Sequence, residues 1–194
     1  MQETQRSVLL ISGAPASGKS TLARSLAESF GFPLISKDTI KESLFDSLGS
    51  RLGAQIESPD ELSRLLSRAA MEMLWSLAPS CPRVILEANF RPKSEYERGR
   101  VSALQGRKLE IYCHCTPAEA ARRFRERAAT VRQHPAHSMK TMSATLLEEF
   151  DRPFGLCPVI DVDTEHPVDP AEVAMRIRRY WPDLNDYACQ FRSV

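Results

Sequence analysis

The sequence has no excess of charge of either sign and no long hydrophobic run. Its 194 residues carry 26 Lys and Arg against 25 Asp and Glu, a formal net charge of +1. Bulk electrostatics therefore favours neither nucleic acid nor a membrane surface as a partner. No apolar stretch approaches the ~18 residues that span a bilayer, and residues 1–6 are polar, unlike a signal peptide. We expect one domain, residues 1–194, in the cytoplasm.

Cysteine is scarce and lacks the spacing of a metal site. The five cysteines are odd in number, which is typical of reduced thiols rather than of a disulfide framework. Cys113, His114 and Cys115 have the residue types of a metal cluster. However, they fall in a predicted strand, where neighbouring side chains face opposite sides of the sheet. We therefore do not expect a metal there.

One segment has the Gly-x-x-x-x-Gly-Lys-Ser/Thr spacing of a P-loop. It consists of Gly13, Ala14, Pro15, Ala16, Ser17, Gly18, Lys19, Ser20 and Thr21. An apolar run precedes it, and helical periodicity follows it. The glycines let successive backbone N–H groups point inward at phosphates, and the helix dipole adds positive potential. Lys19 is expected to reach the β- and γ-phosphates and Ser20 to bind Mg²⁺. The segment predicts binding of a nucleoside triphosphate, with ATP and Mg²⁺ as the cofactors.

Apolar runs alternate with helical periodicity along the whole chain. The expected strands are 7–12, 33–36, 83–88, 109–114 and 158–163, and the expected helices are 18–30, 38–48, 60–78, 93–104, 117–130, 138–150 and 170–180. This alternation predicts an α/β fold with a parallel sheet and helices on both faces. Residues 49–59 are expected to form a loop, and residues 49–82 an insert on the acceptor side. We expect the residues after Trp181-Pro182 to be loosely held.

Asp38 is a candidate catalytic base. It follows the second expected strand, and ligands of open parallel sheets bind beyond the carboxyl ends of the strands. A carboxylate there can accept a hydroxyl proton while the acceptor attacks the γ-phosphate. Lys41, one helical turn later, is near enough to steady a substrate anion. The alternative is that Asp38 only caps the helix that it precedes.

Glu87 ends the third expected strand and has two interpretations of its own. It either contributes to Mg²⁺ binding, directly or through an ordered water, or serves as a second candidate base. The sequence leaves both open.

An arginine-rich stretch covers residues 117–140. Arg123 and Arg127 are four apart and share a helix face, and Arg132 follows. Arginines on a closing segment can stabilise the charge of a transferring phosphoryl group and exclude water. We therefore expect a lid over about 117–140, with Arg123 and Arg127 in catalysis. The alternative is a solvated helix in which Glu119 and Glu126 are the partners of these arginines.

These motifs together resemble a known family. They are the P-loop, Ser-Lys-Asp-x-x-Lys-Glu at 36–42, Leu-Glu-Ala-Asn-Phe at 86–90 and Arg-x-His-Pro-x-His at 132–137. The chain from about 7 to 180 resembles the small AAA-type ATPase/kinase group of P-loop kinases, which is similar to chloramphenicol phosphotransferase and to the kinase domain of polynucleotide kinases. The family more often has glycine where Ala136 stands.

The resemblance implies the roles of several residues. Lys19 and Ser20 would bind ATP·Mg, and Asp38 would be the base for the substrate hydroxyl. Arg123, Arg127 and Arg132 would be lid arginines, with Arg132 contacting the nucleotide. The resemblance also implies an NMP-kinase-like P-loop NTPase fold, with five parallel strands, the P-loop strand at the centre and a purine-contacting loop after residues 161–164.

The sequence thus predicts an ATP-dependent kinase for a hydroxyl of a small-molecule acceptor. One alternative is a nucleic-acid 5′-hydroxyl kinase, for which a run of basic residues could track phosphates. The run consists of Arg91, Lys93, Arg98, Arg100, Arg107 and Lys108, and Glu95 and Glu97 interrupt it. Another alternative is a regulatory nucleotide-binding module without transfer activity. For acceptor contacts, the exposed face of the 60–78 helix is the candidate, with Arg64, Arg68 and Glu72.

Overall fold

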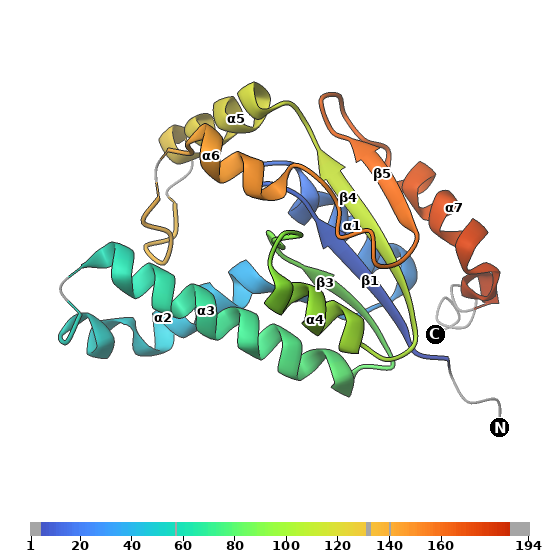
Figure 1. Cartoon of the computed structure of the whole chain (residues 1–194), viewed down its shortest axis with the longest axis horizontal. Helices are drawn as coiled ribbons and strands as arrows, with labels where there is room; N and C mark the ends of the chain where they lie inside the picture. Colours follow the sequence, from blue (N-terminus) through green and yellow to red (C-terminus); the bar gives the residue numbers. More distant parts are fainter. Residues whose placement is uncertain (1–4, 57, 131–132, 140, 187–194) are drawn as a thin grey trace, which may run out of the picture.

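The computed structural model describes residues 5–56, 58–130, 133–139 and 141–186, and its centre is a five-stranded parallel sheet (Figure 1). The strands are β1 (Ser7–Ser12), β2 (Leu34–Ser36), β3 (Arg83–Glu87), β4 (Arg107–His114) and β5 (Val159–Asp163). Their order is β2-β3-β1-β4-β5. The P-loop strand β1 is central, and all six of its residues are buried. The α/β fold with five parallel strands is therefore confirmed.

Helices cover both faces of the sheet. The helices α1 (Lys19–Phe30) and α7 (Pro170–Tyr180) pack on the face that carries Leu9 and Ile11. The helices α3 (Pro59–Leu77) and α4 (Glu95–Ala103) pack on the face that carries Val8 and Leu10. Because the side chains of β1 are buried in both directions, the strand reads as a continuous apolar run rather than an alternating one.

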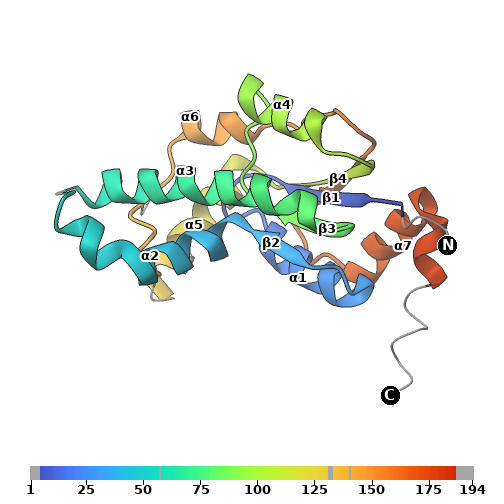
Figure 2. The same cartoon turned by 90° about the horizontal axis from the view of Figure 1, so that it is seen from below.

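Three more helices lie around the carboxyl ends of the strands. Figures 1 and 2 show α2 (Lys37–Gly53) beside α3, with the pair extending away from the sheet. The helices α5 (Pro117–Thr130) and α6 (Ala144–Leu147) lie beyond the carboxyl ends of β1 and β4 (Figure 1). Short 3₁₀ helices follow at Ala78–Ser80, Glu148–Phe150 and Pro182–Asp186. The helices α2, α5 and α6 thus gather at the edge of the sheet where a ligand of this fold class binds.

Helix starts follow from local sequence. The Thr116 hydroxyl accepts a hydrogen bond from Glu119 N at 3.3 Å, and Asp169 Oδ1 accepts one from Ala171 N at 2.8 Å. Both side chains act as caps, and a proline in the first turn follows each of them. The end of α1 is set by Gly31, whose φ of 64° is readily adopted by glycine.

The structure corrects three expectations about the elements. The expected loop at 49–59 is mostly helix, because α2 continues to Gly53 with no proline to stop it. The expected helix at 138–150 is only Ala144–Leu147, followed by a 3₁₀ turn. After Trp181, residues 182–186 form a 3₁₀ helix in which Leu184 is buried and Asp183 binds Arg107 at 2.5 Å. Residues 187–194 of the expected tail lie outside the described residues. Within the described ranges, no helix has the length and apolarity to cross a membrane.

Candidate active site

The P-loop joins the end of β1 to the start of α1 in a strained backbone conformation. Gly13 has a φ of 139° and Gly18 of 78°, and Ala16 is a non-glycine residue with a φ of 63°. A side chain at Gly13 would lie 2.1 Å from the Cys113 carbonyl oxygen, so only glycine fits between the loop and β4. Such a conformation turns backbone N–H groups toward one point and is typical of an anion-binding nest.

Lys19 is the first residue of α1 and is only 4% exposed. Its ammonium group donates a hydrogen bond to the Ala14 carbonyl at 3.2 Å and lies 3.9 Å from Glu87 Oε1. The positive charge is therefore held at the inner side of the P-loop, close to the carboxylate that ends β3.

Glu87 is buried where three segments meet. Ser20 Oγ donates to its Oε1 at 3.0 Å, and Ser36 Oγ donates to its Oε2 at 2.6 Å. The carboxylate thus links the P-loop helix to the ends of β2 and β3. A hydroxyl and a carboxylate are hard oxygen donors of the kind that Mg²⁺ prefers, and Mg²⁺ keeps most of its waters, so few protein ligands suffice. Ser20 and Glu87 therefore fit a Mg²⁺ ion.

Asp38 lies in the first turn of α2 and is partly exposed. The N-cap position belongs to Ser36, so Asp38 is inside the helix rather than ahead of it. Burial alone raises the pKa of Asp38, but surrounding positive groups outweigh that effect and lower the pKa below its usual value. These groups are Lys37, Lys19, His137 and Lys41. At neutral pH the side chain is therefore a carboxylate able to accept a proton.

Lys41 is a nearly buried cation on the same helix. It is 5% exposed, and its ammonium group donates to Ser63 Oγ on α3 at 2.8 Å. Burial, together with the like charge of Lys37, lowers the pKa of Lys41 to about 8. Ser63 in turn donates to the Ala136 carbonyl at 2.9 Å. Lys41 is thereby connected to the His-Pro-x-His segment.

The described segment 133–139 contacts α2 through its two histidines. His134 Nε2 lies 3.1 Å from Asp46 Oδ1, and His137 Nε2 lies 2.9 Å from Glu42 Oε1. The ring of Phe45 meets the His134 ring edge-on, with centroids 5.7 Å apart. This segment therefore lies against the helix that carries Asp38. Glu42 and Asp46 lie four residues apart and so share a face of α2, which is the sequence signal for this contact.

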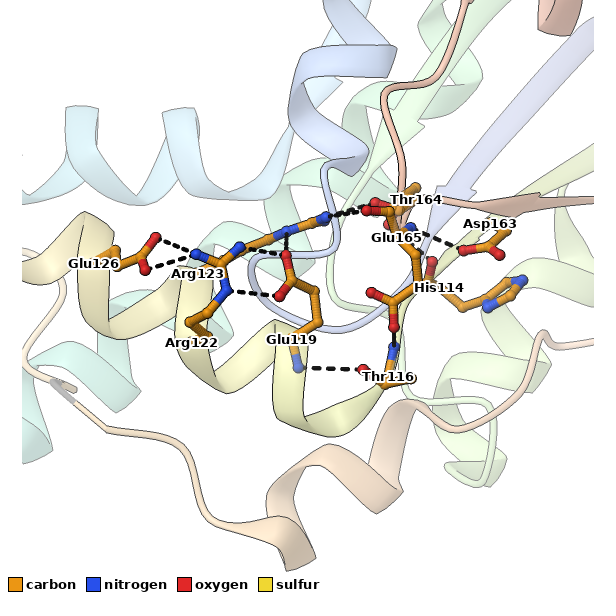
Figure 3. A network of polar contacts seen from close by, with 9 residues as sticks. All are labelled: His114, Thr116, Glu119, Arg122, Arg123, Glu126, Asp163, Thr164 and Glu165. Carbon is orange, nitrogen blue, oxygen red and sulfur yellow. Dashed lines mark hydrogen bonds and ion pairs between the residues drawn. The ribbon is translucent and has the colours of Figure 1, made fainter.

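Figure 3 shows where the structure places Arg123. Its Nε donates to Glu119 Oε1 at 2.5 Å, and its Nη2 donates to the carbonyls of Thr164 at 2.6 Å and Glu165 at 3.3 Å. The guanidinium group therefore contacts the segment after β5. Arg127 is exposed on α5, and Arg132 lies outside the described residues.

Other charges of α5 pair along the helix. Arg122 binds Glu119 and Glu126 at 2.6 Å each, as in a solvated helix (Figure 3). Hydrogen bonding from Arg122, and then from Arg123, lowers the pKa of Glu119 to about 2. The pairing of Arg122 and Arg123 with Glu119, and of Arg122 with Glu126, is that of a solvated helix. The catalytic roles expected for Arg123 and Arg127 stay predictions.

The run of basic residues considered for nucleic acid is engaged within the protein. Arg91 binds Glu149 at 2.8 Å and Lys93 binds Asp151 at 3.0 Å. Arg98 donates to the Phe154 carbonyl, and Arg100 contacts Glu72. Arg107 binds Asp183, and Lys108 donates to the Leu104 carbonyl. These cations do not form a free stripe for phosphates.

The helix α3 has a buried and an exposed face. Leu62, Leu66 and Leu74 are buried, whereas Met73 is 41% and Leu77 is 43% exposed. Arg64, Arg68 and Glu72 are exposed, as expected, and Glu72 contacts Tyr96 and Arg100 of α4.

Comparison with known proteins places the chain in a family. The AAA_33 family, described as an AAA domain, matches residues 8–149, and the chain belongs to this family. A search of curated proteins finds no match.

Several solved structures with this fold are described as kinases. A protein of Chloroflexus aurantiacus, assigned as a kinase by inference, is 28% identical with a TM-score of 0.75, covering 90% of this chain and 98% of its own. A gluconokinase from Sinorhizobium meliloti is 21% identical with a TM-score of 0.53, covering 100% of both chains. A shikimate kinase from Bacteroides thetaiotaomicron is 14% identical with a TM-score of 0.55, covering 92% of this chain and 99% of its own. At these last two identities the likeness establishes the fold alone, which is that of P-loop kinases.

Proposed function

We propose that this protein is an ATP-dependent kinase that transfers the γ-phosphoryl group to a hydroxyl of a small-molecule acceptor. The observation that carries the proposal is the position of Asp38. Its carboxylate lies beside the P-loop edge of the sheet, among cations that include Lys19 and Lys41. A P-loop alone indicates nucleotide binding, whereas an ionised carboxylate at the start of α2, near Lys19, would supply the proton acceptor that transfer to an alcohol requires.

The proposed reaction uses each group once. Backbone N–H groups of residues 13–18 other than Pro15, together with the Lys19 ammonium, hold the β- and γ-phosphates. Mg²⁺ held by Ser20 and Glu87 would neutralise phosphate charge when bound. Asp38 orients the acceptor hydroxyl and takes its proton. The acceptor oxygen bonds to the γ-phosphorus as the bond from that phosphorus to the bridging oxygen breaks, leaving ADP.

Two segments would enclose this reaction. Residues 117–140 serve as the lid, with Arg127 and Arg132 as the candidates for stabilising charge on the transferring group. Residues 49–82 bound the acceptor side, because Ser63 of α3 lies within this range and connects Lys41 to the lid segment. The contacts of His134 and His137 with α2 support a closed arrangement over Asp38.

The identity of the acceptor is a separate question from the kinase reaction. Similarity to chloramphenicol phosphotransferase or to polynucleotide kinases is a hypothesis that the acceptor test addresses. The engagement of the basic run within the protein favours a small molecule over a nucleic-acid end.

The experiment is a screen for acceptor-dependent ADP release. Acceptors would include gluconate, shikimate, nucleosides, chloramphenicol and oligonucleotides with a 5′-hydroxyl, each assayed with wild type and with Asp38→Asn. The proposal expects at least one small hydroxyl compound to stimulate ADP release in wild type and not in the variant. ADP release that no acceptor stimulates would support the regulatory module instead.

A further inference from the structure

The segment after β5 lies beside the start of the P-loop helix. Thr164 is buried, and both its backbone N and its hydroxyl donate to the His114 carbonyl at 2.8 Å. A methyl group placed on Gly18 would lie 3.9 Å from Thr164 Cβ. A nucleotide whose phosphates occupy the P-loop therefore has this segment as a neighbour.

Arg123 ties the lid helix α5 to that segment. Its guanidinium group donates to two consecutive carbonyls, those of Thr164 and Glu165, while Glu119 holds its Nε from the same helix (Figure 3). Hydrogen bonds from a charged donor are stronger than those between neutral groups. The guanidinium group of the partly buried Arg123 is thus held on two sides, at Nε and at Nη2.

A second hydrogen bond joins the same two segments, with its donor before α5 and its acceptor on Glu165. The Glu165 carboxylate accepts from Thr116 N, just before α5, at 3.0 Å, and Glu165 N donates to Asp163 Oδ1 at 2.8 Å. The beginning of α5 and residues 164–165 therefore hold each other in place from both sides (Figure 3).

We propose that Arg123 is a positioning residue for the nucleoside part of the bound nucleotide. By holding the Thr164 and Glu165 carbonyls from the α5 side, it fixes the backbone of these two residues beside Gly18, next to which a nucleotide on the P-loop extends. The inference rests on the proposed use of ATP, but it requires only nucleotide binding and not transfer. It assigns to Arg123 a contribution to affinity that depends on the base and ribose and not on the phosphates.

Arg122 is the matched control. It lies on the same helix and binds the same Glu119, but its other partner is Glu126 and not the segment after β5. Loss of a guanidinium group and of a bond to Glu119 is therefore common to both variants, whereas loss of the carbonyl contacts is specific to Arg123.

The test is calorimetric titration of the wild-type protein, Arg123→Gln and Arg122→Gln with ATP and with inorganic tripolyphosphate, each with Mg²⁺. Tripolyphosphate has the phosphates without base or ribose. We expect Arg123→Gln to weaken ATP binding by about tenfold or more, the worth of a charge-assisted hydrogen bond, with tripolyphosphate binding unchanged. Arg122→Gln should change neither constant.

Arg123→Lys provides a second measurement if the glutamine variant does not fold. It keeps the charge but loses the planar fork, so it should weaken ATP binding selectively and by less. Equal weakening of ATP and tripolyphosphate would overturn the inference by placing Arg123 at the phosphates. Unchanged binding of both would also overturn it. If the wild-type protein binds both ligands but transfers no phosphoryl group, the proposed function fails and this inference stands; if it binds neither, both fail.

Discussion

The Ser36 hydroxyl donates a 2.6 Å hydrogen bond to Glu87 Oε2, which joins the ends of β2 and β3. Ser20 of the P-loop helix donates to the other oxygen of the same carboxylate. Glu87 is therefore oriented by two hydroxyl donors, one of them Ser20, whereas Asp38 in the first turn of α2 has an ion pair with its neighbour Lys37 at 3.5 Å. This division favours metal binding for Glu87 and proton transfer for Asp38.

Glu87→Gln should weaken the dependence on Mg²⁺ more than any other property. The amide of Gln has one oxygen, so it cannot accept the hydrogen bonds of Ser20 and Ser36 on two oxygens as the carboxylate does. It also lacks the negative charge that attracts Mg²⁺. Loss of such a ligand or of its support typically costs about 10–100-fold in metal affinity. Titration of ATPase or kinase activity with Mg²⁺ measures this effect. If saturating Mg²⁺ leaves a rate deficit of the size expected for a lost base, Glu87 rather than Asp38 is the proton acceptor.

Asp38→Asn should lower kcat by about 10²–10⁴-fold and leave the Kd for ATP nearly unchanged, because the amide keeps the size of the side chain but cannot accept a proton. Single-turnover kinetics and calorimetry measure the two constants. Thr39→Ala, at the neighbouring exposed position, serves as the control. A variant with reduced thermal stability and a normal rate would show that Asp38 has only a structural role.

Lys19→Met should abolish binding of the triphosphate while the fold persists. Methionine fills the space of the buried aliphatic stem and removes the charge that meets the phosphates. Calorimetry with ATP and circular dichroism of the same sample check both parts. Wild-type affinity in this variant would show that the Lys19 ammonium group does not meet the phosphates.

The pKa of Lys41 leads to a stability prediction with a defined sign. Its pKa is lowered from 10.5 to about 8 in the folded protein, so between these values the unfolded chain binds more protons than the folded one. Stability contributed by this group therefore rises with pH over that window. Urea unfolding of the wild-type protein and of Lys41→Met, below pH 8 and near pH 10.5, should show a smaller rise in the variant. Parallel pH profiles would contradict a buried, protonated Lys41.

The sheet was predictable because its strands read as short apolar runs separated by capped helices. Each strand of the structure lies within two residues of its expected range, and Thr116 and Asp169 cap the helices that follow them. The P-loop spacing also placed Lys19 and Ser20 correctly at the start of α1. Local patterns of this kind depend on neighbouring residues, which a sequence shows directly.

Contacts between distant segments were not predictable in the same way. Glu110 lies within an apolar strand, is fully buried, and accepts hydrogen bonds from Ser12 Oγ, Phe154 N and Gly155 N. Nothing in the local sequence indicates those partners. The contact of Arg123 with two carbonyls after β5 is of the same kind, because the partners are backbone groups that any residue type supplies.

The most direct test of phosphoryl transfer is the fate of the γ-phosphoryl group in water enriched in oxygen-18. Wild-type protein, Mg²⁺, ATP and an acceptor that stimulates ADP release would be incubated, and the products analysed by mass spectrometry. If the γ-phosphoryl group passes directly to an acceptor hydroxyl, with Asp38 as the base, the phosphorylated acceptor contains no oxygen-18 and its amount equals that of the ADP formed. Inorganic phosphate carrying oxygen-18, with no phosphorylated acceptor, would show that water is the only acceptor and would contradict the kinase assignment.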